Sequence, residues 1–154
     1  ALPRATDTNP NANPIPMNPD GTTPLGKDRE EEGNYILDRE TFKEQAVHFD
    51  FDSSTVRPAD KGKIDGVATF LKGQPTYHLK IEGHCDERGT DGYNMALGER
   101  RALAIREYLI SVGIAGDRVN TISFGEDKPA VLGHDEAAWA KNRRGEFVLM
   151  KPKA

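Results

Sequence analysis

The chain has 154 residues, of which 36% are hydrophobic and 30% charged, and its formal net charge at pH 7 is −4. This length suits one domain with some additional chain, and the lack of a stripe rich in lysine and arginine argues against a protein that binds nucleic acid. No apolar run approaches the roughly 18 residues that a membrane span requires, and the single cysteine, Cys85, excludes an internal disulfide and a metal site built on several thiolates.

Residues 1–34 are predicted to form a flexible tail or tether. The segment NPNANPIPMNPDGTTPLG is rich in Pro, Asn, Thr and Gly, and the acidic run KDREEEG follows it. Such a composition buries too little apolar surface to offset the entropy lost on ordering. The sequence therefore predicts one folded domain over residues 35–154, and a partner-binding motif in the tail is the alternative to a plain tether.

The domain is predicted to alternate strands and helices. In the first strand, Val47, Phe49 and Phe51 alternate with polar residues, which is the period of a half-buried strand. Pro58 suits the first turn of a helix. Helices that follow strands in this way predict an α/β sandwich, with helices packed on a sheet. The expected elements are strands at 47–52, 76–84, 118–125 and 145–150, and helices at about 58–72, 91–112 and 135–141.

Arg101 falls on the apolar face of the long predicted helix. On a helical wheel that places Leu97 at 0° and advances about 100° per residue, Ile105 lies at about 80° and Leu109 at about 120°. Arg101 lies at about 40°, between Leu97 and Ile105. A guanidinium in such a position must have a partner or reach water. Three explanations remain open: a structural ion pair with Asp86, extension of the side chain to solvent, or a ligand pocket shared with Asp86.

The ligand explanation has a definite chemical content. An arginine presents a planar fork of donors that matches a carboxylate with two parallel hydrogen bonds. An aspartate accepts hydrogen bonds from an ammonium group. Arg101 and Asp86, held a few ångströms apart, would therefore recognise an amino-acid head group, which carries both charges.

Three segments of the chain carry a resemblance to a known family. They are VHFDFDSSTVRP, IEGHCDERGTDGYNMALGERRALAIREYL and SFGEDKPAVLGHDEAAWAKNRRGEF, and together they resemble the OmpA-like C-terminal domain family of Gram-negative bacteria over about residues 45–150. The loops resemble the lipid-anchored members more than the porin members. The resemblance implies an α+β sandwich with a mixed four-stranded sheet, and with two main helices and a short third helix on one face.

The resemblance also implies a function. Members of this family bind the stem peptide of peptidoglycan without a covalent bond, chiefly at meso-diaminopimelate, and link the outer membrane to the cell wall. A location in the periplasm, a partner resembling the periplasmic protein TolB, and attachment to the outer membrane through a lipid anchor are implied as well. No anchor is visible in these residues, and neither an enzymatic activity nor a cofactor is expected.

The family motifs imply a peptidoglycan-binding site made of six residues. Asp86 would bind the ammonium end of the ligand, Arg101 the carboxylate end, and Arg88 the carboxylates of the peptide. Cys85 is a departure, because the family usually has threonine or alanine there. The implied site residues are Phe51, Asp52, Asp86, Arg88, Leu97 and Arg101.

Two other functions are weighed against this one. A metal-dependent wall hydrolase would use His84, Asp86 and His134. The adjacent residues His84, Cys85 and Asp86 alternate between the two faces of an extended segment, so the three do not easily converge on one ion. The spacings that make a metal site convincing are also missing, so no metal is expected. The same fold could instead belong to a porin or a flagellar stator protein.

Overall fold

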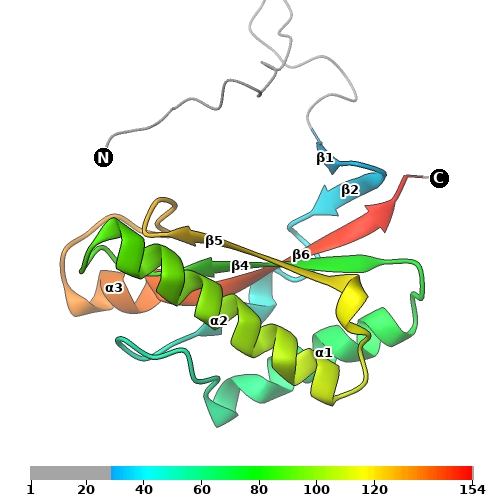
Figure 1. The fold of residues 1–154 in the computed structure, drawn as a ribbon, viewed down its shortest axis with the longest axis horizontal. Coiled ribbons are helices and arrows are strands. Elements are labelled where there is room, and N and C mark those ends of the chain that lie inside the picture. The colour runs from blue at the N-terminus through cyan, green and yellow to red at the C-terminus, as the bar shows by residue number, and fades with distance from the viewer. Residues whose placement is uncertain (1–28, 154) are drawn as a thin grey trace, which may run out of the picture.

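The computed structural model describes residues 29–153, and a mixed sheet forms its centre. The order of strands is β1-β2-β6-β4-β5, and β3 pairs with β6 (Figure 1). Only the β4–β5 pair is parallel; the other pairs are antiparallel. The strands are β1 Glu30–Glu32, β2 Tyr35–Asp38, β3 Val47–His48, β4 His78–His84, β5 Val119–Gly125 and β6 Arg144–Pro152.

Two long helices pack on one face of the sheet, and α2 crosses β4, β5 and β6 in Figure 1. Alternation along β4 explains this packing, because Leu79 and Ile81 lie in the hydrophobic core with the helices while Glu82 and His84 face the other way. The helices are α1 Pro58–Lys72, α2 Asp91–Ser111 and α3 Glu136–Asn142, with short 3₁₀ turns at Lys43–Gln45 and Gly116–Arg118. None of the described helices is both long and apolar enough to cross a membrane.

A close contact between two glycines fixes α2 on the sheet. A Cβ atom added to Gly83 on β4 would lie 1.8 Å from the carbonyl oxygen of Gly98 on α2. Any larger residue at either position would push the helix away from the strand. This contact brings the first half of α2, including Arg101, against the carboxyl end of β4.

The predicted fold class is confirmed, with differences at the beginning of the domain. The four predicted strands are present, but the first is limited to Val47–His48. It ends early because the chain then turns: Asp52 has a φ of 54°, and Ser53 N donates to Asp50 O at 3.2 Å. Two further strands, β1 and β2, extend the sheet beyond β6. Thus Glu30–Glu32, inside the predicted tail, forms a strand, and residues 1–28 of that tail lie outside the described residues.

Candidate functional site

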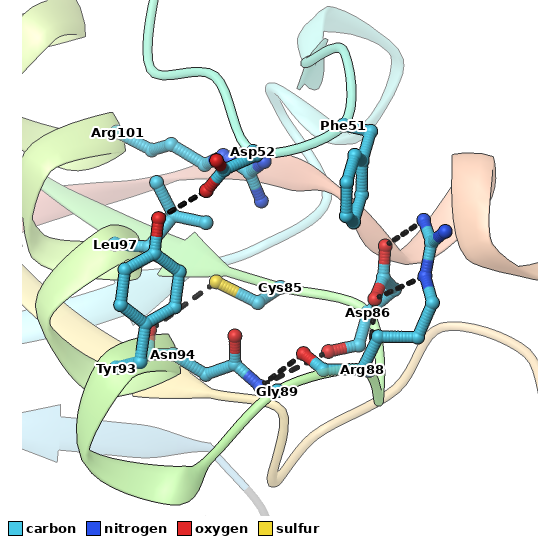
Figure 2. Close-up of a pocket in the computed structure, with 10 residues that line it drawn as sticks. All are labelled: Phe51, Asp52, Cys85, Asp86, Arg88, Gly89, Tyr93, Asn94, Leu97 and Arg101. Atoms are coloured by element: carbon cyan, nitrogen blue, oxygen red, sulfur yellow. Dashed lines mark hydrogen bonds and ion pairs between the residues drawn. The ribbon is translucent and has the colours of Figure 1, made fainter.

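A pocket of about 220 Å³ lies where the carboxyl end of β4 meets the first half of α2 (Figure 2). Its walls come from the turn after β3, the loop after β4, and α2. All six residues implied by the family motifs line it. The complete lining is Phe51, Asp52, Cys85, Asp86, Arg88, Gly89, Tyr93, Asn94, Leu97 and Arg101.

The Arg101 side chain is 1% exposed, and backbone carbonyls surround it. Its Nε donates to Ser53 O at 2.8 Å, Nη1 to His84 O at 2.9 Å and Nη2 to Asp50 O at 3.1 Å. Both structural explanations from the sequence are therefore wrong: Arg101 neither forms an ion pair with Asp86 nor extends to water. Instead it joins α2 to the end of β4 and to the turn after β3.

This arrangement leaves Arg101 as a buried cation without an anionic partner. Within residues 29–153 no carboxylate lies within ion-pair distance of it, and burial lowers the pKa of its guanidinium. A guanidinium has five N–H groups, so the three bonds to carbonyls leave two N–H groups over. The residue is one of the ten that line the pocket, where those donors are suited to an anionic ligand.

Asp86, by contrast, is held by arginines. Its carboxylate accepts from Arg88 N at 2.9 Å, Nε at 3.2 Å and Nη2 at 2.8 Å, and Arg143 Nη1 lies 3.5 Å away. Burial alone would raise the pKa of Asp86, but the hydrogen bonds from Arg88 and the charges of both arginines lower it. Asp86 is therefore ionised at neutral pH and supplies a fixed negative charge opposite Arg101 (Figure 2).

Aromatic rings hold Arg88 in place. Its guanidinium carbon lies 4.0 Å from the ring centre of Phe51 and 4.0 Å from that of Trp139. Contact with two aromatic rings favours a planar cation at this position. The outer face of Phe51 remains open, since this residue is 60% exposed.

Three pocket residues, Gly89, Tyr93 and Asn94, were missed by the sequence reasoning. The hydroxyl of Tyr93 donates to Asp52 Oδ1, which connects α2 to the turn after β3. The buried amide of Asn94 donates to Arg88 O at 2.9 Å and to Glu126 Oε1 at 2.6 Å, and so holds the loop after β4. Tyr93 lies one helical turn before Leu97, and that spacing is the only signal that could have placed it on the same wall.

Cys85 contributes a neutral thiol to the pocket wall. The side chain is 3% exposed, and Sγ donates to Asn94 O at 3.2 Å. Burial raises the pKa of this thiol to about 11. A protonated thiol of this size adds no charge to the pocket, so the departure from the family pattern preserves the electrostatics set by Arg101 and Asp86.

The residues of the alternative metal site do not converge. His84 turns its ring to the outer face of the sheet, near Glu82 and Glu146. His134 Nδ1 is bonded to Glu87 Oε2 at 2.7 Å on the surface, and Asp86 is held by Arg88. Among the described residues, no metal-like grouping combines His84, Asp86 and His134.

Comparisons with known proteins agree with the fold and the motifs. A model of the OmpA family matches residues 48–143. The chain is 47% identical over 103 residues to the peptidoglycan-associated lipoprotein of Rhizobium meliloti, covering 67% of this chain and 58% of that protein. It is 45% identical over 112 residues to the protein of the same name from Pasteurella multocida, covering 73% of this chain and 75% of that protein.

Solved structures of related proteins also match this fold. The crystal structure of the peptidoglycan-associated lipoprotein from Burkholderia pseudomallei matches with a TM-score of 0.66 and 44% identity, over 68% of this chain and 88% of that chain. The C-terminal domain of Helicobacter pylori MotB matches with a TM-score of 0.63 and 20% identity, over 68% of this chain and 82% of that chain. At that identity the second likeness concerns the fold alone.

Proposed function

The chain belongs to the OmpA family, and from this membership we propose that its domain binds peptidoglycan without forming a covalent bond. Relatives that are 45–47% identical are named for their association with peptidoglycan. The domain acts as a binding module and not as an enzyme. The pocket beside α2 is the site through which it binds the wall.

The ligand is the head group of meso-diaminopimelate in the stem peptide. The observation that carries this proposal is the buried guanidinium of Arg101, which lines the pocket without an anionic partner among the described residues. A ligand carboxylate would accept from its two remaining N–H groups and supply the missing countercharge. Asp86, on the other side of the pocket, would receive the ammonium group.

The other pocket residues fit subsidiary roles. Leu97 would supply an apolar floor, and Phe51 and Asp52 line the pocket from the turn after β3. Arg88 already uses three of the roughly four acceptor positions of the Asp86 carboxylate. The incoming ammonium therefore takes the remaining position or displaces Arg88, which is then available for the carboxylates of the peptide.

The same family membership supports a place in the cell envelope. We place the domain in the periplasm as the wall-binding part of a Tol-Pal system, with the full-length protein attached to the outer membrane through a lipid anchor. A TolB-like protein would contact the face around residues 84–100, which includes the pocket. Binding to the wall and binding to this partner would then exclude each other.

Retention on purified sacculi tests the ligand. Wall of the diaminopimelate type should retain the protein, whereas wall of the lysine type, which lacks the second carboxylate, should not. Asp86→Asn should release the protein, because the ammonium loses its counter-ion. Asp91→Asn is the matched control, since it removes the same charge from an exposed residue outside the pocket lining. Equal retention on both walls, or equal loss with both variants, would contradict the proposal.

A further inference from the structure

A second cluster of potential ligands lies on the outer face of the sheet, away from α1 and α2. Glu82 and His84 are two residues apart on β4 and so face the same side. Glu146 on β6 is the direct cross-strand partner of Glu82. One ligand atom from each of these three residues lies within 4.8 Å of the others.

The imidazole of His84 is the unusual member of this cluster. It is 2% exposed, yet within the described residues neither Nδ1 nor Nε2 has a hydrogen-bond partner. Buried polar atoms almost always have a partner, so two unpaired nitrogens on one ring call for an explanation. A neutral imidazole keeps a lone pair on one ring nitrogen, and that lone pair is the form in which histidine binds a metal ion.

Two arginines hold the carboxylates of the cluster. Arg39 Nη1 donates to Glu82 Oε1 at 2.7 Å and Nη2 to Oε2 at 3.0 Å, while Arg144 Nε donates to Glu146 Oε2. Oε1 of Glu146 has no partner among the described residues.

Arg39 is able to release Glu82. Its side chain is 39% exposed, and it also donates to Glu30 on β1, so a second counter-ion is already in place. A surface hollow lined in part by Arg39, Lys43 and Glu146 adjoins the cluster at Glu146. A small cation can therefore approach from solvent and exchange places with the guanidinium.

We propose that Glu82, His84 and Glu146 bind one divalent transition-metal ion of the Zn²⁺ type, and that Arg39 competes with the ion for Glu82. One imidazole and two carboxylates form a donor set that suits Zn²⁺, and three protein ligands leave a fourth position open. This site shares no ligand with the peptidoglycan pocket. It also differs from the His84, Asp86 and His134 set, whose residues lie apart.

Titration of the full chain with Zn²⁺ in a calorimeter tests the site. We expect one equivalent to bind to the wild type. Glu146→Gln should weaken binding at least about tenfold, since a ligand is lost. Arg39→Gln should strengthen binding, because it removes the competing cation. His134→Gln is the control and should bind as the wild type does, since its ring contacts Glu87 on the surface.

Histidine ring resonances provide a second readout that does not depend on any variant. Among the four histidines, addition of Zn²⁺ should shift the ring nitrogens of His84 most. The proposal is overturned if the wild type binds no Zn²⁺ up to about 1 mM, which corresponds to about 4 kcal/mol. It is also overturned if Glu146→Gln binds Zn²⁺ like the wild type, or if the shifts fall on another histidine.

Discussion

Arg101→Lys should destabilise the domain strongly, although it keeps the charge. Three different nitrogens of Arg101 donate to three carbonyls, those of Asp50, Ser53 and His84. A lysine has one nitrogen, so it replaces at most one of these bonds in the same place. Two hydrogen bonds from a charged donor, at about 1.5 kcal/mol each, amount to about 3 kcal/mol. In a domain of this size, that loss lowers the melting temperature by about 10 °C.

Thermal unfolding followed by circular dichroism measures this effect. Arg100→Lys is the matched control, because Arg100 is the neighbouring residue, is exposed, and makes no hydrogen bond to a carbonyl in the described structure. The control should melt within about 2 °C of the wild type. If Arg101→Lys also melts within that margin, the three carbonyl bonds do not hold the turn after β3, and the structural role assigned to Arg101 is refuted.

Further substitutions probe the rest of the structure. Gly83→Ala should lower the free energy of unfolding by about 3 kcal/mol, because the new Cβ would overlap Gly98 O. Gly62→Ala in α1 meets nothing within 4 Å, so it should raise the free energy of unfolding by about 0.5–1 kcal/mol. Chemical denaturation measures both changes. Burial alone would raise the pKa of Asp38, but hydrogen bonds from the turn that follows lower it to about 2. The stability that Asp38 contributes is thus present above about pH 4 and lost as the pH falls toward 2, so the melting temperatures of wild type and Asp38→Asn should converge over that interval. The thiol of Cys85, with its pKa raised to about 11, should react with a disulfide reagent at pH 8 only at the rate of unfolding.

Hydrophobic periodicity was sufficient to predict most of the fold. The pattern of Ile64, Val67 and Leu71 predicted α1, and all three side chains are fully buried. β1 could not be predicted in the same way, because three consecutive glutamates have low strand propensity. Their pairing depends on cations from other parts of the chain: Glu30 contacts Arg39, and Glu32 contacts Lys80. Such long-range charge pairs have no local signature.

The end of the first strand was also beyond the sequence pattern. Phe49 is buried and Phe51 is 60% exposed, although alternation assigned both to the same face. The chain leaves β6 after His48 and turns at Asp52 in a left-handed conformation. Phe51 is thereby free to stack on Arg88 and to form one wall of the pocket.

At the candidate site, the helical wheel identified Arg101 as exceptional, and charge complementarity suggested Asp86 as the second half of a ligand pocket. The family motifs supplied the other four residues. The partners of Arg101 were not predictable, because every residue carries a backbone carbonyl and no side-chain type marks the three that are used. Asn94 was missed for the opposite reason. Its side chain is typical of an exposed helix position, and only the fold shows that it is buried against the loop after β4.

Because Arg101 stabilises the fold and also lines the pocket, its substitution cannot by itself measure ligand binding. A variant at this position would lose the turn that carries Phe51 and Asp52 together with the donors for the ligand. A better test leaves Arg101 in place and removes the carboxylate from the ligand. Wall of the lysine type provides such a ligand, because it lacks the second carboxylate. The protein itself is unchanged in this comparison, and so is its melting temperature. If its retention depends on that carboxylate, the two remaining N–H groups of Arg101 bind the ligand. If retention does not depend on that carboxylate, Arg101 serves the fold alone.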